Sequence, residues 1–107
     1  MANPFKFLLR AFAPISDNEE NNFRAKLQAA GLQSSVIDCI IHVVKIGPSL
    51  KNPQARAYAS AMERSFDEYG LPGLSMQIAY FLMNAGQWTG PEARSIKAVL
   101  NKWSRAQ

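Results

Sequence analysis

The placement of glycine and proline constrains the fold of this 107-residue chain more than any other feature. Both residue types disfavour the interior of a helix, proline because it lacks an N–H and glycine because it loses the most conformational entropy. They divide the sequence into blocks of 10 to 17 residues, and each block carries helix signals. The dividing residues are Gly31, Gly47, Gly70, Gly73, Gly86 and Gly90, together with Pro4, Pro14, Pro48, Pro53, Pro72 and Pro91.

The helix signals are apolar residues spaced i, i+3, i+4 and i+7, with capping residues at the start of several blocks. Ser16 with Glu19, and Thr89 with Glu92, have the spacing of capping boxes. We therefore predict an all-α protein, a compact bundle of about six short helices that forms one domain over residues 1–107. The predicted helices cover residues 4–13, 17–30, 35–46, 53–69, 73–85 and 90–105.

The block at residues 35–46 is the most apolar of the six, and its valines and isoleucines would also suit a strand. Its length, a cap formed by Ser35 and Asp38, and the Gly47-Pro48 stop favour a helix. Its few polar residues lie on one stripe, so the helix is expected to be central and buried.

Several charged residues have the spacing of ion pairs within a single helix. Glu20 stands four residues before Arg24, and Arg64 stands four residues before Glu68. Asp38 lies one turn before His42, so a local ion pair or hydrogen bond is the simplest expectation for that histidine.

The composition is that of an ordinary folded protein, with 48% apolar residues and a net charge of +4. A single cysteine excludes a disulfide within the chain and suggests a reducing compartment. We find no apolar stretch long enough for a membrane span and no convincing signal peptide. A cytoplasmic location is therefore the default expectation.

Catalytic chemistry finds little support in the sequence. Cys39 and His42 are three residues apart and could meet on a helix, but Cys39 stands among isoleucines and valines and is better explained as a buried residue. One histidine, one cysteine and scattered carboxylates do not make up a metal site, and no phosphate-binding or hydrolase motif occurs. We expect neither an enzyme nor a bound metal or cofactor.

The block at 73–85 contains no charged residue, which marks it as either a second core helix or a contact surface. Its residue types, with a tryptophan in the following turn, are those favoured at protein interfaces. The leading hypothesis is a non-enzymatic interaction or regulatory module that contacts another protein or a second copy of itself. The candidate interface residues are Met76, Tyr80, Met83 and Trp88.

The alternative hypothesis is a small DNA-binding protein that uses the basic face of the last helix. The preceding helix and turn superficially resemble a helix-turn-helix, although a solvated helix face is the favoured explanation of the charges. The candidate contacts are Arg94, Lys97, Asn101 and Arg105. The predicted first helix is amphipathic and basic, but its ten residues are short for membrane binding, so packing onto a protein is the preferred interpretation.

Overall fold

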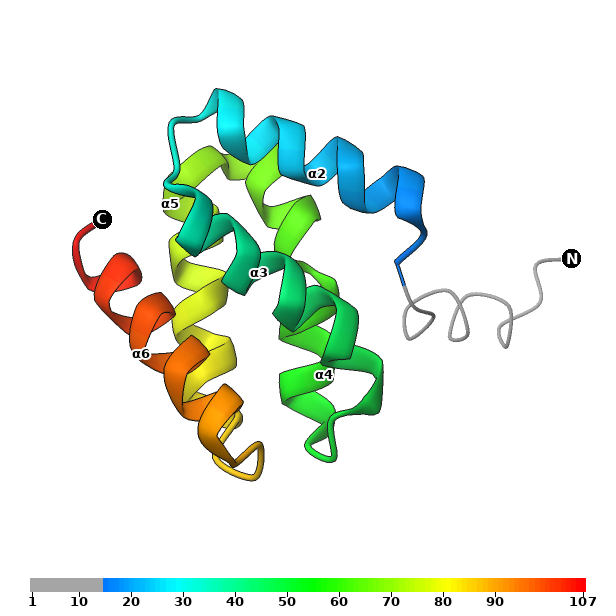
Figure 1. The fold of residues 1–107 in the computed structure, drawn as a ribbon, viewed down its shortest axis with the longest axis vertical. Helices are drawn as coiled ribbons and strands as arrows, with labels where there is room; N and C mark the ends of the chain where they lie inside the picture. The colour runs from blue at the N-terminus through cyan, green and yellow to red at the C-terminus, as the bar shows by residue number, and fades with distance from the viewer. Residues whose placement is uncertain (1–14) are drawn as a thin grey trace, which may run out of the picture.

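The computed structural model describes residues 15–107, and within that range the chain is helical with no strand (Figure 1). The all-α prediction is confirmed for these residues, whereas the helix predicted at 4–13 lies outside them. The elements are α2 (Asp17–Ala29), α3 (Ser34–Ile46), the short 3₁₀ helix η1 (Gly47–Ser49), α4 (Pro53–Ser60), α5 (Met62–Asn84) and α6 (Pro91–Arg105).

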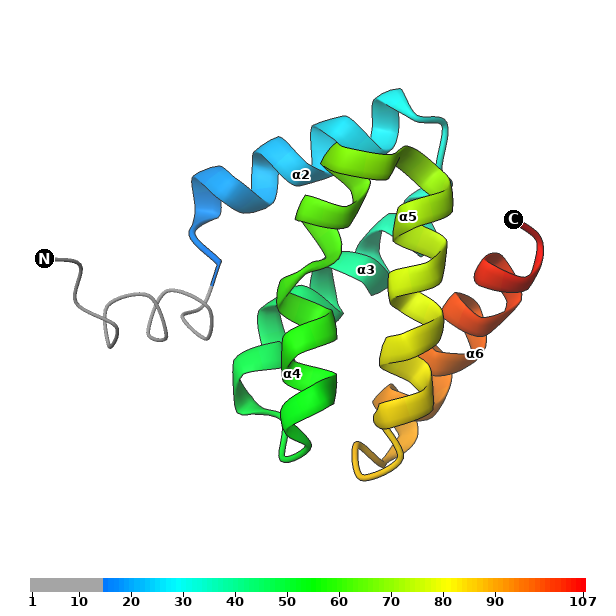
Figure 2. The same ribbon diagram turned by 180° about the vertical axis from the view of Figure 1, so that it is seen from behind.

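The helices enclose a core. Among the described helices, α3 contributes the most buried residues to it. Helix α2 crosses one end of the bundle, and α5 and α6 run side by side in opposite directions (Figures 1 and 2). As predicted, α3 is largely buried, because most of its circumference is apolar. The largest fully buried side chains are Phe23 and Leu27 of α2, Ile37, Ile40 and Val43 of α3, Met62, Leu74, Ile78 and Phe81 of α5, and Leu100 of α6.

The region predicted as two helices, 53–69 and 73–85, is divided differently. The chain first breaks at Ala61, whose φ of −93° and ψ of 0° separate α4 from α5. The backbone is non-helical again at Gly70, with a φ of 70° and a ψ of −155°, so α5 consists of two helical parts that meet at a kink near the predicted break. Pro72 is tolerated because it lies in the first turn after the kink, where its missing N–H would have no partner.

Gly73 allows the two parts of α5 to come close together at this kink. A Cβ atom on Gly73 would lie 2.5 Å from the Cβ of Tyr69 and 2.7 Å from the carbonyl oxygen of Ser65. Both distances are shorter than van der Waals contact. Gly70 therefore supplies the left-handed backbone and Gly73 supplies the space that the kink requires.

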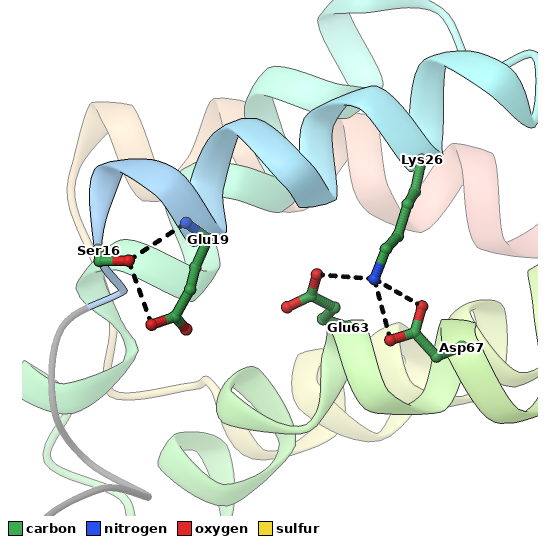
Figure 3. Close-up of polar contacts among 5 residues, drawn as sticks. All are labelled: Ser16, Glu19, Lys26, Glu63 and Asp67. Carbon is green, nitrogen blue, oxygen red and sulfur yellow. Dashed lines mark hydrogen bonds and ion pairs between the residues drawn. The ribbon is translucent and has the colours of Figure 1, made fainter.

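The caps that begin the helices were predicted correctly in part. The backbone N–H of Glu19 donates to Ser16 Oγ at 3.2 Å, and the Ser16 hydroxyl donates to Glu19 Oε1 at the same distance (Figure 3). Helix α6 instead follows Gly90, with a φ of 110° and no side-chain cap, so the predicted box of Thr89 and Glu92 does not form. Helix α3 likewise begins without a side-chain cap, which corrects the predicted cap from Ser35 and Asp38.

Most charged side chains of α2 pair with other helices rather than within α2. The expected pair of Glu20 and Arg24 is replaced by two contacts to α3, because packing brings opposite charges within reach. Arg24 lies 2.6 Å from Asp38, and Glu20 lies 3.2 Å from Lys45. The pair within α5, Arg64 with Glu68 at 3.1 Å, forms as predicted.

Lys26 connects α2 to the start of α5. Its Nζ lies 3.2 Å from Glu63 Oε2 and 3.0 Å from Asp67 Oδ1, so one ammonium group bridges two carboxylates (Figure 3). The hydrogen bond that Lys26 donates to Asp67 is the largest cause that raises the pKa of Lys26 above 10.5, while burial opposes it and Glu63 adds to it. The ion pairs of α2 therefore fix that helix across the end of the bundle.

Candidate protein-contact surface

The second half of α5 carries large apolar side chains on its outer side. Met76 is 59% exposed, Tyr80 43% and Met83 78%, and Tyr69 before the kink is 70% exposed. Within residues 15–107 these four are the only large apolar side chains that are well exposed. We call Tyr69, Met76, Tyr80 and Met83 the α5 strip.

Three residues of the strip are exposed because the part of α5 after the kink is apolar around its circumference while only one side meets the core. Leu74, Ile78 and Phe81 point inward and are fully buried. A turn of 3.6 residues places positions 76, 80 and 83 on the opposite side, one above the other. No charged residue occurs between Tyr69 and Ala85, and two of the polar residues there, Ser75 and Gln77, are half-buried and bonded to α6 and α4.

Tyr80 extends the strip towards α4. Its ring stacks on that of Tyr58, with the centroids 5.5 Å apart and the ring planes inclined by 30°. The side chain of Gln77 donates to the Tyr58 carbonyl at 3.2 Å, which holds the two helices together beneath the rings. The aromatic part of this surface is therefore held in place by two helices.

Trp88, the fourth predicted interface residue, occupies a different position from the other three. It is half-buried in the turn between α5 and α6, against the core. Its ring stacks on His42 with centroids 6.2 Å apart and contacts Phe81 at 6.0 Å. Lys97 Nζ lies 5.7 Å from the ring centroid and donates to the Trp88 carbonyl. Trp88 thus joins α3, α5 and α6, a structural role that its position in the sequence did not reveal.

The two residues considered for catalysis, Cys39 and His42, have different surroundings. Asp38 pairs with Arg24 and not with His42, which corrects the expected local contact. His42 Nε2 instead lies 2.6 Å from Glu92 Oε1, although no hydrogen bond of good geometry joins them. Burial, and secondarily the negative charge of Asp38, raises the pKa of the half-buried Cys39 thiol, which favours its unreactive neutral form. Among residues 15–107 no cluster of three metal-binding side chains occurs.

The basic face of α6 is only partly available to a partner. Lys97 is half-buried and engaged with Trp88, whereas Arg94, Asn101 and Arg105 are exposed. Within residues 15–107 neither arginine has an acidic partner. The antiparallel arrangement of α5 and α6 differs from a helix-turn-helix, whose helices cross at about 90–120°.

A shallow cavity that the sequence did not predict lies between two turns. Its volume is about 310 Å³, and it is open to solvent. One wall comes from the segment around Leu50 and Asn52, and the other comes from Asn84 and Trp88. The Asn52 side chain is already engaged there, because it accepts hydrogen bonds from the backbone N–H groups of Gln54 and Ala55 and caps α4.

Comparisons with known proteins do not point to a function for this chain. No family model, no curated protein and no solved structure matches the chain. No helix within residues 15–107 has the length and apolar character needed to cross a membrane. The α5 strip and the exposed arginines of α6 are therefore the two candidate binding features.

Proposed function

We propose that this protein is a non-enzymatic interaction module of the cytoplasm, which binds another protein through the α5 strip. The observation that carries the proposal is the concentration of exposed apolar side chains on one helix. Tyr69, Met76, Tyr80 and Met83 all lie on α5, and the other described helices keep their large apolar side chains covered. Methionine and tyrosine are enriched in protein interfaces, whereas scattered single apolar residues are normal on any surface.

The size of the strip supports a binding role. Large side chains bury roughly 150–250 Å² each, so four partly exposed ones offer on the order of 500 Å². A standard interface buries about 800 Å² on each partner, so the strip supplies more than half of one side. The neighbouring Tyr58 ring, stacked on Tyr80, enlarges the same surface.

Photo-crosslinking in the native host tests this proposal. The photoreactive amino acid p-benzoylphenylalanine replaces Met83 in one protein and Ala29 in a matched control. Both residues are exposed, but Ala29 lies on α2 and is not part of the strip. We expect discrete protein adducts from position 83 and none from position 29. No adduct at position 83, or the same adducts at both positions, would reject the proposal.

The second candidate function is DNA binding by the basic face of α6. It is favoured by one observation, that Arg94, Lys102 and Arg105 lack acidic partners within residues 15–107. A phosphate-binding role predicts affinity for duplex DNA that falls steeply with added salt. A mobility-shift titration at 50 and 200 mM salt, with Arg94→Gln as the comparison, distinguishes this function from a protein-binding one.

A further inference from the structure

The outer faces of α5 and α6 form one continuous surface. The part of α5 that follows the kink lies beside α6 in both views (Figures 1 and 2). The Ser75 hydroxyl donates to the Ser104 carbonyl at 3.1 Å, which marks a point of contact between them. Met76 and Arg105 directly follow these two residues in the sequence, so both lie close to this point of contact.

Helix geometry places two arginines on the side of α6 that adjoins the strip. Successive residues of a helix turn by about 100°, so Arg94 and Arg105 lie roughly 80–100° from Ser104 on the helix circumference. Lys102 lies about 160° from Ser104 by the same geometry and faces away from α5. By this helix geometry, Arg94 and Arg105 are expected to lie nearer to the α5 strip than Lys102 does.

The border of the strip is positively charged without compensation. From residue 69 to the end of the chain the only acidic residue is Glu92, and it lies against His42. Residues 15–68, by contrast, hold seven acidic and six basic residues. The basic ones there include Arg24, Lys26, Lys45 and Arg64, which all pair with carboxylates. The α5–α6 side of the molecule thus combines apolar side chains with free positive charge.

We propose that the partner of the α5 strip is an acidic amphipathic helix; this rests on the protein-binding function proposed above. Met76, Tyr80 and Met83 form a row about 10 Å long, which matches apolar residues at i, i+3 or i+4, and i+7 on an opposing helix. Acidic residues beside that apolar row would meet Arg94 and Arg105, which supplies charge complementarity.

The same features disfavour the other occupants. A second copy docked strip to strip with antiparallel helices would bring one set of arginines against another, and like charges oppose such a contact. With parallel helices the arginines would face α4, which carries no acidic residue. Duplex DNA would satisfy the arginines but would leave the methionines and Tyr80 without an apolar partner. An acidic amphipathic helix would contact the apolar side chains of the strip and pair with the arginines of α6 at the same time.

A peptide selection tests the partner chemistry. A random-peptide phage library is panned against the full chain, and enriched peptides are measured against Met76→Gln/Met83→Gln and the matched control Ala25→Gln/Ala29→Gln on α2. We expect peptides that lose binding only with the α5 variant and that carry acidic residues beside apolar ones at helical spacing. Circular dichroism melting curves establish that each variant remains folded.

A pair of charge reversals locates the acidic contact. Arg105→Glu and Lys102→Glu change the net charge equally and lie in the same last turn of α6. We expect Arg105→Glu to weaken binding about fivefold and Lys102→Glu by less than twofold, given that exposed pairs contribute ~0.2–1 kcal/mol. Added salt should narrow this difference because exposed charges are screened.

The possible outcomes separate the two proposals. Peptides that depend on the strip but are neutral or basic, or equal effects of both reversals, would overturn the acidic helix and leave protein binding intact. Strip-dependent self-association, or binding to phosphatidylserine vesicles or duplex DNA in place of acidic peptides, would also overturn it. No strip-dependent peptide at all would count against protein binding itself.

Discussion

The α2–α3 side and the α5–α6 side of this protein use the same residue types in opposite ways. On the first side, charged residues pair between helices, as Arg24 does with Asp38, and apolar side chains such as Phe23 are fully covered. On the second side, Met83 is mostly exposed and Arg94 has no acidic partner among the described residues. The first side is stabilised by contacts within the chain, whereas the second leaves apolar and positively charged side chains exposed.

The largest expected difference between the two sides concerns their apolar side chains. Phe23→Ala should lower the free energy of unfolding by about 3–5 kcal/mol, because it removes a fully buried ring and leaves a cavity. Met83→Ala should change it by less than ~0.5 kcal/mol, because most of that side chain already faces solvent. Urea unfolding of both variants measures this contrast. A large loss in Met83→Ala would show that the chain itself covers the strip.

The kink of α5 gives the next largest effect. Gly73→Ala places a Cβ against Tyr69 and the Ser65 carbonyl, so we expect a loss of about 1–3 kcal/mol. Gly86→Ala is the matched control, since a Cβ there meets nothing within 4 Å and its φ lies outside the left-handed region. Thermal unfolding compares the two. Equal midpoints would mean that the two parts of α5 do not approach each other as described.

The charged side chains sharpen the comparison with a smaller effect. Arg24→Met breaks a contact between α2 and α3 and should cost about 0.5–1 kcal/mol, because the pair is partly exposed. Arg94→Met removes a cation with no acidic partner and should leave the free energy of unfolding unchanged within ~0.3 kcal/mol. Chemical denaturation at low salt resolves both values. A comparable loss in Arg94→Met would indicate that this arginine stabilises the fold and is not reserved for a partner.

The fold was predictable from sequence wherever a helix has both a periodic apolar face and a clear end signal. Helices α2 and α6 begin and end within a residue of the predicted bounds for this reason. No glycine or proline stands at the break at Ala61, so no local sequence signal predicts that break. Gly70, by contrast, does signal a break, and the backbone is non-helical at that residue.

The candidate site was predictable only as a set of residue types. Met76 and Trp88 are equally suited to an interface or to a core, and only the packing of distant helices separates them. Trp88 is covered because His42 of α3 and Lys97 of α6 reach it, whereas no described helix covers Met76. Charge pairing also depends on tertiary packing. Arg24 pairs with Asp38, fourteen residues away, and not with Glu20, four residues before it.

The smallest expected effect is the pH dependence of the Lys26 bridge between α2 and α5. The pKa of Lys26 is raised in the folded protein, mainly by its hydrogen bond to Asp67 and then by Glu63, so the folded state holds the proton more tightly than the unfolded state. The resulting stability is fully present below pH 10.5, the ordinary value, and is lost as the pH rises through the raised pKa. Because the side chain is 42% exposed, solvent screening limits the effect to about 0.5 kcal/mol.

Lys26→Gln isolates this contribution, because every other titrating group is shared with the unmodified protein and cancels in the difference. Urea unfolding at pH 9 and pH 11.5 should show the unmodified protein losing about 0.5 kcal/mol more than the variant over that interval. Added salt should reduce the difference, since the bridge is partly exposed and its charges are screened. An identical pH dependence in the two proteins would mean that Lys26 contributes nothing to holding α2 in place. The contacts of α2 with α3 would then be the whole of its charged attachment to the bundle.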